Sequence, residues 1–294
     1  MRALAMLLWL AGCNQAFDLA GTELIPSTDA PVAPDVDQDG VPDSEDNCPS
    51  AANPLQGDED ADTLGDVCDN CPLIANADQR NDGDSDAIGD LCDPRPVQAG
   101  DCLILLDTFT GADASMAHWL ARPTTPASNV SATTEGLLFD PPSQRATLVP
   151  LGDDGQPIRG LFDVVLVGMA NEKPGSILGA AATTDPAYNE LFSCQLHDGD
   201  EVRLDMPTKY VLTDLSVDPI APNIAMRISL RDPAASPLTA SCRIDYGIAV
   251  GTVNSYDQPP AAGEPGIIAQ GDPVTITGFA LYQRRTTCPT PIMR

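Results

Sequence analysis

The sequence predicts a mainly β protein in which an acidic repeat segment without a hydrophobic core precedes an antiparallel β-sandwich. From Asp35 to Asp93 the chain has eighteen acidic residues, one arginine and no phenylalanine, tryptophan or tyrosine, too little apolar surface for a core. From about Gly100 to Arg294 aromatic residues return, and short segments alternate apolar with polar residues, as half-buried strands do. Roughly ten to twelve such strands with turn residues between them indicate one sandwich.

The first thirteen residues predict export. One arginine is followed by about ten apolar residues, which is too short a run to span a bilayer, and then by Leu10-Ala11-Gly12-Cys13. This order resembles a bacterial lipoprotein signal ending in its lipobox, which implies that Cys13 becomes the mature N-terminus and carries acyl chains that anchor it in a membrane. An ordinary secretory signal is the alternative. Asn14 after the cysteine favours the outer membrane and the cell surface over the inner membrane.

The rest of the chain divides into three parts by composition. Residues 14–34 are rich in Gly, Ser, Thr and Pro and have no periodicity, so they predict a flexible linker. Residues 35–99 are the acidic repeats, and residues 100–294 are the sandwich. The nine cysteines leave eight for four disulfides if Cys13 is lipidated.

The acidic segment repeats one frame three times. Aspartates occupy places 1, 3, 5, 9 and 12 of twelve residues, and a branched apolar residue occupies place 7. Carboxylates at these places and the backbone carbonyl at place 7 are the ligands of a calcium loop. The predicted metal ligands are Asp35, Asp37, Asp39, Val41, Asp43 and Asp46; Asp58, Asp60, Asp62, Leu64, Asp66 and Asp69; and Asp82, Asp84, Asp86, Ile88, Asp90 and Asp93.

A solvated, disordered polyanion is the alternative reading of so many aspartates. The fixed frame argues against it, and all-oxygen ligation favours Ca²⁺ over Mg²⁺ or zinc. The loops differ from EF-hands, because prolines interrupt the flanking segments and place 12 is Asp in place of Glu. We therefore expect the affinity of an extracellular module, with calcium and disulfides substituting for a core.

The segments around the cysteines resemble thrombospondin type 3 repeats. The matching motifs are Asn-Cys-Pro at 47–49 and 70–72, each followed by Asn and Gln, and Gly-Asp-x-Cys-Asp at 65–69 and 89–93. The resemblance implies disulfides Cys48–Cys68 and Cys71–Cys92. Two departures are an extra residue between Gln79 and Asp82, and Thr63 and Ala87 where glycine is usual at place 6. Cys68-x-x-Cys71 also fits redox chemistry or half a zinc site, which export makes the weaker alternative.

Several segments of the C-terminal part have the period of strands. Alternating apolar residues run through 192–196, 202–206, 224–230, 242–250 and 274–281, with a change of phase at Gly278 that predicts a bulge. Only residues 112–121 predict a short helix. The opening and closing strands resemble those of a concanavalin-like or laminin-G-like lectin sandwich (jelly roll), in which terminal strands lie side by side. We therefore expect disulfides Cys102–Cys288 and Cys194–Cys242.

No catalytic motif accompanies this sandwich in the sequence. A glycoside hydrolase needs two paired carboxylates, commonly Glu-x-Asp-x-x-Glu on one strand, and the nearest segment, 201–205, lacks a third member. His118 and His197 have no nucleophile motif beside them. Twenty-two acidic against twelve basic residues disfavour nucleic acid. The rings available for stacking on a sugar are Trp119, Tyr188, Tyr210 and Tyr256, although such rings are more often core residues than binding residues.

These observations predict a calcium-binding, lipid-anchored surface protein without enzymatic activity. Its sandwich is expected to act in adhesion by binding an extracellular glycan or protein. Two alternatives remain, a surface polysaccharide hydrolase and a purely structural spacer in the cell envelope.

Overall fold

The computed structural model describes residues 33–109, 116–122, 130–140, 145–169, 177–184, 190–197, 201–206, 210–214, 223–230, 240–245, 250–255, 263–271 and 273–294. From Asp35 onward they belong to one compact unit. The predicted lipobox with Cys13 and nearly all of the predicted linker lie outside the described residues. Within the described ranges, no helix is long and apolar enough to cross a membrane.

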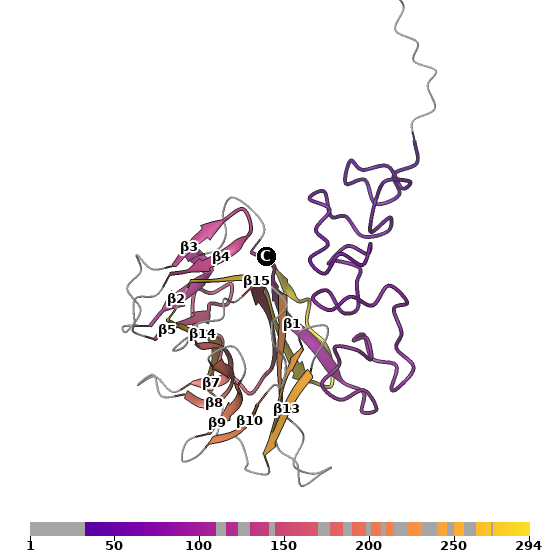
Figure 1. Ribbon diagram of the computed structural model, residues 1–294. Helices are drawn as coiled ribbons and strands as arrows, with labels where there is room; N and C mark the ends of the chain where they lie inside the picture. The colour runs from indigo at the N-terminus through magenta and orange to yellow at the C-terminus, as the bar shows by residue number, and fades with distance from the viewer. Residues whose placement is uncertain are drawn as a thin grey trace, which may run out of the picture. The chain divides into compact units, whose positions relative to one another are not determined.

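Residues 33–100 contain turns and bends and no regular strand, and Figure 1 draws them as a succession of irregular loops. The elements that follow are β1 (Asp101–Asp107), the 3-10 helix η1 (Met116–His118), β2 (Trp119–Ala121), β3 (Val130–Thr133), β4 (Gly136–Phe139), β5 (Ala146–Pro150), β6 (Asp163–Met169), β7 (Ile177–Thr184), β8 (Glu190–His197), β9 (Glu201–Asp205), β10 (Tyr210–Asp214), β11 (Asn223–Leu230), β12 (Ala240–Asp245), β13 (Val250–Ser255), β14 (Glu264–Gln270), β15 (Val274–Arg284) and β16 (Ile292–Met293).

The strands form two sheets that face each other (Figure 1). One has the order β13-β12-β11-β6-β15-β1-β16, with β4 beside β15 and β3 beside β4; the other has the order β10-β9-β8-β7-β14-β5-β2. Neighbouring strands run antiparallel apart from β1 and β16, which are parallel. The predicted antiparallel sandwich is thereby confirmed.

The main core fills the space between the sheets. Each sheet supplies every second residue of its strands, such as Val164 and Leu166 from β6 and Cys194 and Leu196 from β8. In β9 the burial alternates strictly, with Val202 and Leu204 inside, as a strand with one solvent-facing side requires. Period-two alternation in the sequence therefore identified the inward faces of β8 and β9.

A second apolar cluster covers the outer face of the first sheet. In β15, Phe279 points into the main core, whereas Ala280 and Tyr282 belong to this second cluster. The repeats contribute its other half, with Leu73 and Ile88 exposed by only 4% each. The repeats thus have no separate core among their described residues, and the apolar side chains they do bury are shared with the sandwich. β1 and β15 are buried on both faces for the same reason.

The bulge predicted at Gly278 is present. The register between β15 and β6 shifts between Ile276 and Gly278. A Cβ atom at residue 278 would lie 2.4 Å from Cδ2 of Leu73, so the glycine lets the repeat side chain pack directly on the strand.

The disulfides are Cys48–Cys68, Cys71–Cys92, Cys102–Cys288 and Cys194–Cys242, the same four pairs that the sequence analysis gives. Two local predictions differ from the structure. The segment predicted as a helix forms η1 and β2 in its described part, and residues 110–115 lie outside that part. The segment 242–250 belongs to two strands, β12 and β13, because alternation alone does not mark where a hairpin turns.

Candidate metal centres

Each acidic loop brings three carboxylates together. Oxygen atoms of the three side chains lie within 4.8 Å of one another in every group, close enough for a single cation. The groups are Asp35, Asp37 and Asp39; Asp58, Asp60 and Asp62; and Asp84, Asp86 and Asp93. Like charges at this separation repel one another, so the arrangement favours a bound divalent ion.

In the first two loops the backbone is wound around the first aspartate. Asp35 accepts hydrogen bonds from the N–H groups of Gln38 and Gly40, at 2.7 and 3.2 Å. Asp58 accepts from Asp62 and Thr63, at 3.2 and 3.1 Å. Through these hydrogen bonds the backbone N–H groups of the loop point inward, toward the side chain of its first aspartate.

Left-handed backbone recurs at the same place of every loop. The residue at place 4 has a positive φ in all three loops, at Gln38, Ala61 and Ser85. At place 6, Gly40 and Thr63 both have positive φ, 98° and 85°. Thr63 therefore adopts the conformation of the glycine that it replaces, at some cost in strain, and that departure from the family pattern leaves the second loop's shape unchanged.

The aspartate at place 12 connects each loop to the next turn of chain. In the second repeat, Oδ1 of Asp69 accepts hydrogen bonds from the backbone N–H of Cys71 at 2.8 Å and from Nε2 of Gln79 at 2.6 Å. Oδ1 of Asp46 has the same two kinds of donor, Cys48 and Gln56, at 2.8 Å each. One oxygen of each carboxylate is fixed in this way.

The remaining oxygens test whether a cation fits. Oδ2 of Asp37 and Asp46 in the first loop, of Asp60 and Asp69 in the second, and of Asp84 in the third is buried and has no hydrogen-bond partner. A buried carboxylate oxygen without a donor is costly, and a metal ion removes that cost. The donors are all hard oxygens, which is the set that Ca²⁺ takes.

The place 9 aspartates close the loops from the other side. Oδ1 of Asp43 accepts from the N–H of Val36 at 2.8 Å, and Oδ1 of Asp66 accepts from Glu59 at 3.0 Å. The backbone N–H groups of Val41, Leu64 and Ile88, at place 7, donate to the place 5 aspartates at 2.8 to 3.0 Å. The predicted use of their carbonyl oxygens as ligands stays a prediction.

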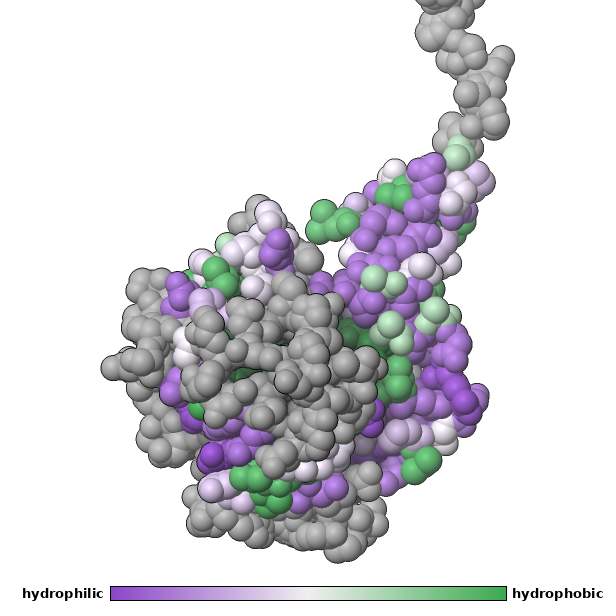
Figure 2. Space-filling view, in the orientation of Figure 1, coloured by the Kyte–Doolittle hydropathy of each residue, from purple (hydrophilic) through white to green (hydrophobic). Residues whose placement is uncertain are grey.

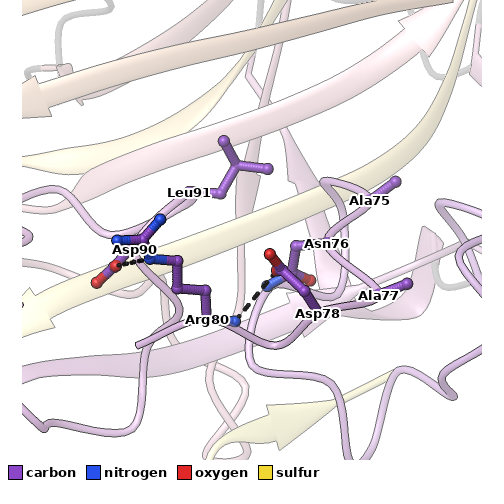
Figure 3. A pocket seen from close by; sticks show the side chains of 7 residues that line it. All are labelled: Ala75, Asn76, Ala77, Asp78, Arg80, Asp90 and Leu91. Atoms are coloured by element: carbon purple, nitrogen blue, oxygen red, sulfur yellow. Dashed lines mark hydrogen bonds and ion pairs between the residues drawn. The ribbon is translucent and has the colours of Figure 1, made fainter. Parts of the chain in front are cut away.

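The side chain of Asp82, a predicted metal ligand, lies apart from the third carboxylate group. It is 72% exposed and paired with Arg80 Nε at 2.8 Å. Arg80 also lies 3.6 Å from Asp90, and Figure 3 shows that contact at the edge of a pocket beside the loop. Asp82, the predicted place 1 ligand, therefore lies apart from Asp84, Asp86 and Asp93, and its role as a ligand stays a prediction.

Some carboxyl groups of the metal-free loops have a pKa above that of a free carboxyl group. Burial and the charges of Asp62 and Asp69 raise the pKa of Asp60 to about 7. Burial also raises the pKa of Glu59 to about 7, opposed by a hydrogen bond with Thr277 of β15. Burial and the carboxyl group of Asp101 raise the pKa of Asp93. Calcium must displace these protons when it binds.

The predicted rings of the sandwich have different positions. Trp119 is 3% exposed, packs edge-on against Phe279 and donates from Nε1 to Asp107 at 2.8 Å, so it belongs to the core and not to a surface site. Tyr210 on β10 is 53% exposed. Tyr188 and Tyr256 lie outside the described residues.

The two histidines lie in different surroundings, and the charge of His118 acts on the buried carboxyl group of Asp107. Nε2 of His197 lies 2.7 Å from Oε1 of Gln195, and the backbone carbonyl of His118 accepts from Leu151.

Comparison with known proteins identifies the repeats. The family model of the thrombospondin type 3 repeat matches residues 33–56 and 56–79. The second match ends before the third loop, the one that contains Asp82. None of the curated proteins compared matches the chain.

Solved structures similar to the sandwich are remote in sequence. A β-glucanase of Bacillus licheniformis is 12% identical over 64% of this chain and 100% of its own, with a TM-score of 0.43. The exoplasmic domain of VIP36 in its Ca²⁺/Man3GlcNAc-bound form is 9% identical over 64% and 93%, with a TM-score of 0.44. The carbohydrate-binding module CBM66 from Bacillus subtilis is 11% identical over 55% and 94%, with a TM-score of 0.37.

The loop geometry, the buried oxygens and the family match agree on the same residues. Residues 33–79, which precede the β-sandwich, carry two thrombospondin type 3 repeats, whose carboxylates are grouped closely enough to hold a cation.

Proposed function

We propose that this is an exported, lipid-anchored, calcium-binding protein of the cell surface, whose sandwich binds an extracellular glycan or protein. The observation that carries the calcium part is the set of buried, unpaired carboxylate oxygens in three successive loops. Four disulfides and a calcium-dependent module suit an oxidising compartment outside the cytoplasm.

The chain order supports a tethered module. Residues 1–13 would direct export and leave Cys13 lipidated, residues 14–34 would be a linker, residues 35–99 the repeats and residues 100–294 the binding domain. A membrane partner enters this proposal only through the lipid on Cys13. The test is partition of the full-length protein into detergent phase: the wild-type chain is expected there, and Cys13→Ser in the aqueous phase. Aqueous partition of both would remove the anchor.

The ligand surface that we favour is the outer side of β9 and β10. Arg203 and Asp205 point away from the core and pair at 2.7 Å, while Val202 and Leu204 point inward. The guanidinium of Arg203 lies 3.9 Å from the ring centre of Tyr210, which is more than half exposed. An exposed ring beside an ordered ion pair offers stacking and hydroxyl-binding groups for a sugar.

Glycan-array binding by the full chain in calcium tests this part. Tyr210→Ala is expected to lose glycan binding, and Leu161→Ala, a partly exposed apolar residue before β6, is the control that keeps it. Release of reducing sugar would instead establish a hydrolase. If neither binding nor hydrolysis is found and no protein partner is captured, the spacer reading survives.

A further inference from the structure

The segment between the third loop and the sandwich repeats the turn that follows the first two loops. Oδ1 of Asp46 and of Asp69 accepts the N–H of the cysteine two residues later, and Oδ1 of Asp93 accepts the N–H of Arg95 at 2.6 Å. Further along each turn, a backbone carbonyl accepts from a residue three positions later, at Cys48, Cys71 and Arg95 alike. Arg95 therefore occupies the place of the disulfide cysteines.

The hydrogen bonds accepted by the place 5 aspartates can also be compared between the three loops. Oδ2 of Asp39 and of Asp62 accepts the N–H of an asparagine fourteen residues later, Asn53 and Asn76. Oδ2 of Asp86 accepts the N–H groups of Gly100 and Asp101, at 3.1 and 2.9 Å. The third loop is thus closed by the backbone that begins β1.

Asn81 takes the place that Asp82 leaves. In the second repeat the carbonyl of Gly57, directly before Asp58, accepts the N–H of Asp66; in the third the carbonyl of Arg80 accepts the N–H of Asp90. By this pairing Asn81 corresponds to Asp58. Its Oδ1 is buried without a hydrogen-bond partner, and its Nδ2 donates to the carbonyl of Asp86, across the loop.

A second buried oxygen without a hydrogen-bond partner belongs to Asp101 on β1. Its side chain is fully buried; Oδ1 accepts from Nε of Arg95 at 2.9 Å, and Oδ2 has no partner. The backbone N–H of Asp101 donates to Oδ2 of Asp86, a member of the third carboxylate group, so Asp101 lies directly beside that group. In the first two repeats a glutamine amide donates to the corresponding aspartate. A buried carboxylate oxygen without a donor, such as Oδ2 of Asp101, is costly, and a bound cation would remove that cost.

We propose that the third metal site is shared between the repeats and the sandwich, with Oδ1 of Asn81 replacing Asp82 and Oδ2 of Asp101 completing the ligand set. The exchange keeps the number of carboxylates at five, because Asp82 is lost and Asp101 is gained. One calcium ion then ties the last repeat to the first strand of the sandwich. This inference rests on calcium binding by the repeats, and the experiments below separate the two.

Ion counting on the full-length chain tests the place of Asn81. Bound calcium is measured after equilibrium dialysis for Asn81→Ala, Asp82→Ala and Asp58→Ala. We expect Asp58→Ala and Asn81→Ala to weaken one binding step by about tenfold or more, and Asp82→Ala to leave every step unchanged. If Asp82→Ala loses a calcium-binding step and Asn81→Ala does not, Asp82 is the first ligand, as the spacing in the sequence predicts, and the proposal is wrong. If wild type binds no calcium, the proposed function fails with it.

The role of Asp101 is tested by a matched pair of aspartates. Both Asp101 and Asp163 pair with Arg95: Asp101 accepts from its Nε and Nη2, and Asp163 accepts from its Nη2. Asp101→Asn keeps an oxygen for Arg95 but lowers the charge of the site, so one calcium step is expected to weaken about tenfold. Asp163→Asn, with the same charge change, is expected to leave calcium binding unchanged. Equal binding by Asp101→Asn and wild type, or equal weakening in both variants, would overturn the shared site. Because the first two sites are built without β1, their unchanged steps report that the repeats of each variant are folded.

Discussion

Asp60 holds a proton close to neutral pH in the metal-free chain, since burial and its aspartate neighbours raise its pKa to about 7. The unfolded chain releases that proton near pH 4, so the metal-free fold loses stability as pH rises from about 4 through 7. Calcium reverses the dependence, because it binds the ionised carboxylate. We predict that calcium affinity falls several-fold from pH 8 to pH 6 and that binding at pH 7 releases protons. Calorimetry in buffers of different ionisation enthalpy measures both, and Asp60→Asn should release fewer protons; equal heats in all buffers would refute the prediction.

Leu73 is one of the repeat side chains that pack on the sandwich. It is 4% exposed and packs over Gly278, so Leu73→Ala leaves a cavity that should cost about 2–5 kcal/mol in the free energy of unfolding. Leu55, which is 87% exposed, is the control, and Leu55→Ala should change that free energy by less than about 0.5 kcal/mol. Urea unfolding in calcium gives both values. Similar values for the two variants would mean that the second apolar cluster contributes little.

At the level of elements, the turn from Asp93 to Gly100 replaces a disulfide with an ion pair. Arg95 pairs with Asp101 and Asp163, and all three side chains are at most 7% exposed. Arg95→Ala leaves two buried carboxylates without their cation and should cost about 3–5 kcal/mol. Arg80, in the exposed pair with Asp82, is the matched control, for which less than about 1 kcal/mol is expected. Thermal unfolding compares the two, and a small loss for Arg95→Ala would contradict a structural role for the turn.

The strands show how far the sequence pattern reaches. Alternation located the inward residues of β8, β9 and β15, and the change of phase at Gly278 located the bulge. It did not predict that β1 and β15 are buried on both faces. Alternation with a period of two indicates a strand that is covered on one face and exposed to solvent on the other. The repeats that form the second layer lie far away in sequence from β15. The small residues Gly278 and Ala280 on the outer face were the available signal.

At the scale of the whole molecule, the repeats and the sandwich depend on each other more than their compositions indicate. The acidic frame predicted the three carboxylate groups, since spacing within a loop is local and survives folding unchanged. The frame also included Asp82, which lies outside the group that Asp84, Asp86 and Asp93 form, and it gave no reason to consider Arg95 or Asp101. Those residues act through contacts between distant parts of the chain, which local spacing does not contain. The surface of the repeats in view is mostly hydrophilic (Figure 2), as expected for a segment that gains its order from metal ions.

Hydrogen exchange of the full-length chain, with and without calcium, tests the central claim most directly. We predict that chelation removes the protection of amides between Asp35 and Asp93, whereas the central strands β6 and β8 of the sandwich keep theirs. Protection of the repeats should return on titration with a midpoint of about 10⁻⁴–10⁻³ M calcium, as for extracellular modules. Unchanged protection of residues 35–93 in chelator would show that the acidic loops are ordered without metal, and the account would be wrong.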